Sequence, residues 1–132
     1  MKKVVFACVH NAGRSQIAAA FFNAIVDPVK ACAYSAGTQP AEKIHPEVEA
    51  VMREVGFDLI AVKPQKLTAE LLGGADMLVT MGCGEQCPFV PGLRTVDWVL
   101  EDPKDQPIAK VRQIRDQIRA RVVSLIADQK FD

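Results

Sequence analysis

Cys8 and Arg14 are separated by five residues in the run Cys8-Val9-His10-Asn11-Ala12-Gly13-Arg14-Ser15. This run follows a short apolar segment and precedes a segment with helical character. In such a loop, backbone N–H groups and the N-terminus of the helix can converge on a tetrahedral anion. Arg14 could hold two oxygens of that anion with its guanidinium, and Cys8 would lie at the base as a thiolate nucleophile. The run therefore predicts attack on phosphate or on an oxyanion of similar shape.

The other residues of this predicted oxyanion-binding loop are Val9, His10, Asn11, Ala12 and Gly13. Gly13 provides backbone freedom, and Asn11 is expected to brace the loop because asparagine tolerates left-handed geometry and bonds locally. We interpret His10 as a loop residue that does not itself act on the anion.

Ser15 can donate its hydroxyl to the Cys8 sulfur, and it can also cap the following helix. A buried structural thiol is the alternative for Cys8, and a surface ion pair is the alternative for Arg14. Placement between a strand and a helix favours the catalytic interpretation of both residues.

Apolar runs alternate with amphipathic runs along the chain. We expect strands over residues 4–9, 31–36, 75–81 and 94–98, and helices over residues 15–26, 46–56, 67–72 and from 107 onward. The last helix carries six apolar residues at helical spacing, Ile108, Val111, Ile114, Ile118, Val122 and Leu125. This alternation predicts an α/β fold with a parallel sheet and helices on both faces.

Loops at the carboxyl ends of parallel strands gather at one edge of the sheet. The loop after the first strand carries Cys8, the loop after the third carries Cys83 and Cys87, and the loop after the fourth carries Glu101 and Asp102. We therefore expect all of these side chains at the same edge of the molecule.

The bulk properties indicate one globular domain, residues 1–132, with 49% apolar residues. Sixteen basic and sixteen acidic residues cancel, so there is no electrostatic case for nucleic acid or an anionic membrane. No apolar run approaches membrane-spanning length, and no signal-peptide cleavage pattern follows the first residues. The four cysteines fit reactive thiols in a cytoplasmic protein better than a disulfide framework. We interpret Cys32 as core packing.

The chain resembles the low-molecular-weight protein tyrosine phosphatase fold and, within it, the cysteine-relay arsenate reductases. The resemblance covers nearly the whole length and is carried by Cys8-x5-Arg14-Ser15, Ser35-Ala36-Gly37-Thr38, Ile44-His45-Pro46, the run 51–56, the run 76–81, Asp97-Trp98 and Asp102-Pro103. It implies a three-layer αβα architecture with a four-stranded parallel sheet in the order 2-1-3-4, and no cofactor.

The resemblance also implies a role for Asp102. By itself, an aspartate before proline is ordinary turn chemistry. Members of the family keep an aspartate before proline here, so the resemblance implies that Asp102 is the general acid that protonates a departing oxygen. Glu101 is the less favoured candidate for that role.

Cys83 and Cys87 distinguish a reductase from a phosphatase, because two thiols can supply two electrons by forming a disulfide. The resemblance implies a relay. Cys8 attacks arsenate, Cys83 attacks the Cys8 sulfur and releases arsenite, and Cys87 attacks Cys83. Thioredoxin or a low-molecular-weight thiol would then reduce the final disulfide, and a small thiol could also resolve the Cys8 adduct instead of Cys87.

We expect no metal site. A zinc half-site is the structural alternative for Cys83 and Cys87, but no second pair of ligands with suitable spacing exists. Some relay reductases bind potassium behind the loop through an acidic residue four positions after the serine, and here that position is Ala19.

Arsenate reductase is the leading prediction, acting as a monomer on arsenate, with phosphate or sulfate able to occupy the same loop. The first alternative is a low-molecular-weight tyrosine phosphatase. Against it, Asp102-Pro103 is followed by Lys104-Asp105 and the loop after Gly37 has no aromatic residue on which a phosphotyrosine ring could stack. A second alternative is a non-catalytic oxyanion-binding or redox-sensing protein that uses Cys8 as a switch.

Overall fold

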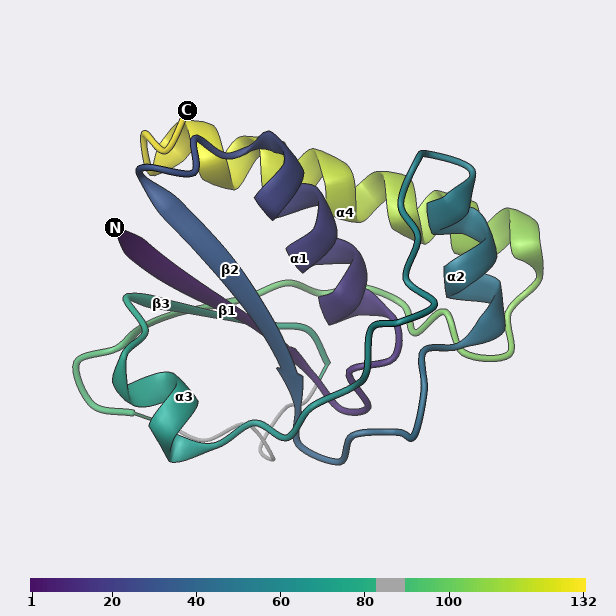
Figure 1. The fold of residues 1–132 in the computed structure, drawn as a ribbon, viewed down its shortest axis with the longest axis horizontal. Coiled ribbons are helices and arrows are strands. Elements are labelled where there is room, and N and C mark those ends of the chain that lie inside the picture. Colours follow the sequence, from purple (N-terminus) through teal and green to yellow (C-terminus); the bar gives the residue numbers. More distant parts are fainter. Residues whose placement is uncertain (83–89) are drawn as a thin grey trace.

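The computed structural model describes residues 1–82 and 90–132, shown in Figure 1. Cys83 and Cys87, which carry the predicted second half of the relay, lie outside the described residues. The elements follow in the order β1 (Lys2–Cys8), α1 (Arg14–Ile25), β2 (Ala31–Gly37), α2 (Pro46–Arg53), α3 (Ala69–Gly73), β3 (Met77–Thr80), β4 (Arg94–Asp97) and α4 (Ile108–Asp128).

The four strands form one sheet in the order β2-β1-β3-β4, and all three pairings are parallel. The expected strand order is confirmed. Cys8 at the end of β1 pairs with Gly37 at the end of β2, and Thr80 at the end of β3 pairs with Asp97 at the end of β4. The carboxyl ends of the strands therefore share one edge of the sheet, as predicted.

Side chains of β1 alternate between two hydrophobic clusters, one on each face of the sheet. Val4, Phe6 and Cys8 belong to the larger cluster with residues of α1, α2 and α4. Val5 and Ala7 belong to the smaller cluster, with Leu72 of α3. Figure 1 shows α1 and α4 on one side of the sheet and α3 on the other, which confirms the three-layer architecture. The alternation places the Cys8 thiol on the α1 side.

The third predicted helix, residues 67–72, is shorter and begins later than expected, at Ala69. Leu67 is not helical because its N–H donates to the Gly37 carbonyl at 2.8 Å. This bond belongs to a short parallel bridge between Lys66 and Gly37, the last residue of β2. Thr68 then caps α3, with its Oγ1 accepting a hydrogen bond from the Leu71 N–H at 3.1 Å. A tertiary pairing thus decides where this helix starts.

The last helix, α4, buries five of the six apolar positions predicted for one face, Val111, Ile114, Ile118, Val122 and Leu125. Ile108, in the first turn, is 39% exposed. Over the two described ranges, no helix combines the length and apolar character needed to cross a membrane.

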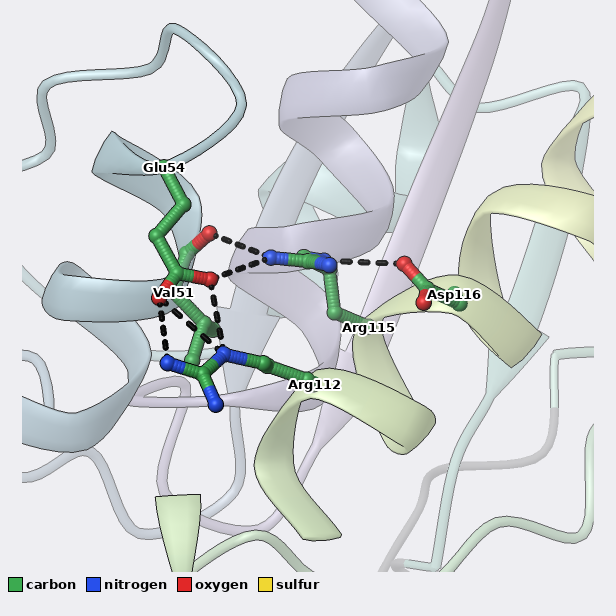
Figure 2. Close-up of polar contacts among 5 residues, drawn as sticks. All are labelled: Val51, Glu54, Arg112, Arg115 and Asp116. Carbon is green, nitrogen blue, oxygen red and sulfur yellow. Dashed lines mark hydrogen bonds and ion pairs between the residues drawn. The ribbon is translucent and has the colours of Figure 1, made fainter. Parts of the chain in front are cut away.

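An ionic cluster ties α2 to α4 (Figure 2). Arg112 contacts both carboxylate oxygens of Glu54, with its Nε at 3.0 Å from each and its Nη2 at 2.8 Å from Oε2. The buried Arg115 donates through Nη1 to Glu54 Oε1 and to the Val51 carbonyl, each at 2.9 Å, and through Nε to Asp116. The hydrogen bond from Arg112 is the main cause that lowers the pKa of Glu54.

Replacing Arg115 should destabilise the fold. Arg115→Ala removes the donor of the Val51 carbonyl and one partner of Glu54, so we expect the free energy of unfolding to fall by about 1–3 kcal/mol. The exposed Arg119 on the same helix provides the matched control, and Arg119→Ala should change stability by less than about 0.5 kcal/mol. Urea unfolding at neutral pH measures both.

The same comparison has a pH dependence. The pairing depresses the pKa of Glu54 in the folded state, so its stabilising effect is present above the ordinary glutamate pKa and is lost as the pH falls through the lowered value. The difference between the native chain and Arg115→Ala should therefore narrow in acid. A difference that does not narrow as the pH falls below the ordinary glutamate pKa would contradict the ionic assignment.

Candidate active site

The loop from Val9 to Gly13 is held by hydrogen bonds to its carbonyl groups. The Val9, His10 and Ala12 carbonyls accept from the N–H groups of Gln39 (2.8 Å), Ala41 (2.9 Å) and His45 (3.0 Å), respectively. The Asn11 carbonyl accepts from the Gln16 side chain (3.1 Å), and the Gly13 carbonyl from the Ile17 N–H (3.0 Å). In a trans peptide the N–H points away from the carbonyl. Because the carbonyls are engaged by the surrounding structure, the loop N–H groups are left to face an anion on the concave side.

Asn11 is the brace of this loop, as predicted. It is fully buried and has a φ of 51°, in the left-handed region. Its Oδ1 accepts from the Gln65 N–H at 2.9 Å and from Gln16 Nε2 at 3.0 Å. Its Nδ2 donates to Ser15 Oγ at 2.7 Å. The two donors on Oδ1 fix the orientation of the amide, so its NH₂ group must face Ser15.

This orientation determines what Ser15 does. Ser15 Oγ lies 2.9 Å from Cys8 Sγ, and both residues are buried. Since the oxygen already accepts from Asn11, its own hydrogen is available to the sulfur. No side-chain hydrogen bond from Ser15 caps α1, whose N-cap position is Gly13. Of the two roles considered for Ser15, the structure supports contact with the Cys8 sulfur.

Arg14 begins α1, and its side chain is directed to the segment after β4. It is 7% exposed, its Nη1 donates to the Leu100 carbonyl at 3.3 Å, and its Nη2 lies 3.6 Å from Asp102 Oδ2. Arg14 is therefore no surface ion pair. It joins the loop after β1 to the loop after β4 at the shared edge of the sheet.

Asp102 is brought to the oxyanion-binding loop by its neighbour Pro103. A methyl group at position 13 would lie 2.8 Å from Pro103 Cγ, so the proline ring packs directly against Gly13. The Asp102 carboxylate is half exposed and faces Arg14. Glu101 instead pairs with Lys110 at 2.7 Å, which leaves Asp102 as the carboxyl group beside the loop.

Two histidines flank this region. His10 lies in the loop, and its Nδ1 is 3.1 Å from the Gln39 carbonyl, which fits the interpretation of a loop residue held outward. His45 precedes α2, near Gly13. Burial lowers the pKa of His45, against the opposing effect of Asp102, so this imidazole is neutral at pH 7.

The remaining sequence predictions concern residues away from the loop. Cys32 is a free, partly exposed thiol in the edge strand β2 rather than a fully buried core residue. Ala19 is packed in the larger hydrophobic cluster. Among residues 1–82 and 90–132, no group of three or more histidine, cysteine or acidic residues is placed to hold a metal ion.

A surface hollow of about 490 Å³ lies between β4 and α4, with Trp98, Arg94 and Arg121 among its lining residues. It borders the outer strand β4, whereas Cys8 is the last residue of the inner strand β1. The hollow is therefore separate from the candidate site at the loop after β1.

Sequence reasoning missed Gln16 and Gln65. Both bond to Asn11 Oδ1, and Gln65 Nε2 also donates to the Ser35 carbonyl at 2.7 Å. Gln16 follows the Arg-Ser pair directly and could have been considered as a brace. Gln65 is far from the loop in sequence, and no local pattern indicates its contact.

A family model for the low molecular weight phosphotyrosine protein phosphatases matches residues 3–131. The chain belongs to this family. The match spans the oxyanion-binding loop, the Asp102-Pro103 segment and every helix and strand of the fold. The predicted fold family is therefore confirmed.

Relatives within the family carry reductase names. A putative arsenate reductase of Halobacterium salinarum is 40% identical, with 93% of this chain and 89% of the relative aligned. A glutaredoxin arsenate reductase of Synechocystis is 34% identical, over 96% of this chain and 98% of the relative. The solved structure of a thioredoxin-dependent arsenate reductase of Corynebacterium glutamicum superposes with a TM-score of 0.83 at 37% identity, and the match covers 97% of this chain and 61% of that one.

The Asn11 network should control both stability and anion binding. Asn11→Ala removes the bonds to Gln65, Gln16 and Ser15, so we expect unfolding to become easier by about 1–3 kcal/mol and phosphate affinity to fall. Asn23 offers a control away from the loop, because its amide makes two hydrogen bonds, at 3.0 and 2.8 Å, to the Ala33 backbone.

Because Asn23 is exposed, Asn23→Ala should lower stability by a smaller amount, and phosphate binding should stay unchanged. Chemical denaturation and phosphate titration followed by amide chemical shifts measure the two properties separately. Equal phosphate affinity in both variants would contradict the assignment of Asn11 as the brace of the loop.

Proposed function

We propose that this protein is an arsenate reductase that uses Cys8 as its nucleophile. The geometry supports attack on a tetrahedral oxyanion, because a buried thiol lies at the base of a loop whose carbonyls are engaged elsewhere, which leaves its N–H groups for an anion. The choice of arsenate rests on one observation above all: a relative with 40% identity over 93% of the chain is named as an arsenate reductase.

The first step uses the residues at the edge of the sheet. Cys8 Sγ, as thiolate, attacks arsenic, and an S–As bond forms as the bond from arsenic to one hydroxyl group breaks. Asp102 protonates that hydroxyl group so that it leaves as water. Arg14 and the loop N–H groups stabilise the negative charge of the arsenate oxygens. The Ser15 hydroxyl, 2.9 Å from the sulfur, stabilises the thiolate before the attack.

The second part is the thiol relay. The Cys83 thiolate attacks Cys8 Sγ and the S–As bond breaks, with its electron pair remaining on arsenic. Arsenic is reduced from the +5 to the +3 state and leaves as arsenite, while the two sulfurs are oxidised to a disulfide. Cys87 then attacks Cys83 and releases the Cys8 thiolate. An external dithiol reduces the Cys83–Cys87 disulfide.

The partners follow from this chemistry. The loop should also accept phosphate or sulfate, which have the same tetrahedral shape. Thioredoxin or a low-molecular-weight thiol is the proposed reductant, and the relatives include both a thioredoxin-dependent and a glutaredoxin enzyme. A relay of free thiols requires a reducing compartment, so we place the protein in the cytoplasm, as a monomer.

A tyrosine phosphatase remains the second candidate, because the family model bears that name. Cys8, Arg14 and Asp102 could cleave a phosphate ester without a second thiol. Replacing Cys83 therefore distinguishes the two activities, because the reductase requires this thiol and the phosphatase does not.

Arsenate reduction coupled to thioredoxin, thioredoxin reductase and NADPH tests the proposal. The native chain should consume NADPH on addition of arsenate, Cys8→Ser should be inactive, and Cys83→Ser should lose turnover. Cys32→Ser is the matched thiol control and should keep activity within about twofold, because Cys32 pairs with Lys3, near the opposite end of β1 from Cys8.

Hydrolysis of an aryl phosphate by the same variants completes the test. Cys83→Ser should retain whatever hydrolysis the native chain shows, whereas Cys8→Ser should retain none. Equal loss of both activities in Cys83→Ser would refute the relay. Hydrolysis without arsenate-dependent NADPH consumption would establish the phosphatase instead.

Replacing Asp102 tests the general acid. Asp102→Asn should lower kcat for arsenate reduction roughly 100-fold, since the departing oxygen loses its proton donor. Glu101→Gln is the control, because Glu101 pairs with Lys110, and its kcat should change little. If Asp102→Asn raises KM while kcat is unchanged, the carboxyl only positions Arg14.

A further inference from the structure

Gly82 holds an unusual position beside Arg14. It directly follows Met81, whose N–H donates to the Ala7 carbonyl at 2.7 Å and so ties the end of β3 to β1. Gly82 then adopts a φ of 82°, in the left-handed region that favours glycine. The sheet therefore fixes where this residue lies, and its backbone turns sharply at that point.

The space beside Gly82 is occupied by the guanidinium of Arg14. A methyl group at position 82 would overlap Arg14 Nη1 and would lie 3.2 Å from Cζ and 3.3 Å from Nη2. On another side the guanidinium is limited by Leu100 and Asp102, which its Nη1 and Nη2 contact at 3.3 and 3.6 Å. A displaced guanidinium would have to give up these contacts or its place beside the loop.

Two other glycines show that the turn alone does not explain this contact. Gly56 and Gly92 have φ values of 94° and 81°, and a methyl group at either would meet no atom within 4 Å. They satisfy a backbone requirement only. Gly82 satisfies the same requirement and, in addition, leaves room for a charged side chain that binds at the site.

We propose that Gly82 is a positioning residue for Arg14, and that its missing side chain leaves the volume in which the guanidinium is held ready for the oxyanion. This inference rests on the proposed function in one respect: it takes Arg14 as the residue that binds the anion. It also gives the exit of β3 a role in anion binding, separate from the thiols that follow it in the sequence.

Gly82→Ala should move the guanidinium and weaken oxyanion binding. Losing a well-placed charge-assisted pair of hydrogen bonds corresponds to a rise in the Kd for inorganic phosphate of roughly 10-fold to 100-fold. Phosphate is the probe because its binding does not require the thiol relay. Any effect of Gly82→Ala on the reactivity of the cysteines that follow it therefore does not change the measured Kd. Amide chemical shifts of residues 9–14 report the binding at constant ionic strength.

Gly92→Ala is the matched control, since it imposes an alanine on nearly the same φ without the steric contact. The melting temperature should fall by a similar amount in both variants. Gly92→Ala should nevertheless bind phosphate with the affinity of the native chain. Equal phosphate affinity in the two variants would overturn the proposal. If Gly82→Ala does not fold, Gly82→Asn is the second variant, because asparagine tolerates a left-handed backbone better, and it should still weaken phosphate binding.

Arg14→Lys allows a second comparison, in which the effect of Gly82→Ala on the Kd for phosphate is measured without the guanidinium. A general structural effect of Gly82→Ala would be the same in both backgrounds. Lysine has no guanidinium to collide with the new methyl group, so adding Gly82→Ala to Arg14→Lys should raise the Kd by less than about twofold. Full additivity would overturn the proposal, as would a native chain whose loop does not bind phosphate. If the native chain binds phosphate but does not reduce arsenate, only the proposed reductase function is refuted. The phosphate affinities of the Gly82 variants then still test the positioning role of Gly82.

Discussion

The hydrogen bonds around Asn11 are the constraint on which the site depends. A loop that presents its N–H groups to an anion must send its carbonyl groups elsewhere, and a free loop has no reason to do so. Here the Asn11 side chain joins the loop to Gln65 and to Ser15, while three N–H groups of the segment between β2 and α2 engage the carbonyls of Val9, His10 and Ala12. The anion site is thus formed by the fold around it before any ligand binds, which is how preorganised electrostatic stabilisation operates.

The same network reaches the nucleophile. Gln16 and Gln65 orient the amide of Asn11, and the amide donates to the Ser15 oxygen, which lies 2.9 Å from the Cys8 sulfur. Residues that do not contact Cys8 themselves therefore position the hydroxyl group beside its sulfur.

Arg14 connects the three loops that follow β1, β3 and β4. It comes from the first, lies against Gly82 of the second, and contacts Leu100 and Asp102 of the third. In a parallel sheet with the order β2-β1-β3-β4, these loops leave neighbouring strands in the same direction. The topology explains why the Asp102 carboxyl group can meet the Cys8 thiol and the Arg14 guanidinium, the proposed nucleophile and anion-binding group, although it is far from them in sequence.

The sequence by itself determined the strand–helix alternation, the loop with Cys8 and Arg14, the bracing role of Asn11 and, through family resemblance, the strand order. These follow from local spacing and residue type. The general-acid role of Asp102 stays a prediction. Only the tertiary structure decided that Ser15 faces the sulfur, that Gln65 orients Asn11, that α3 starts after Leu67, and that Arg115 is buried against Glu54. Each of those depends on a partner distant in the chain, and periodicity along one segment carries no information about the partner that another segment brings to it.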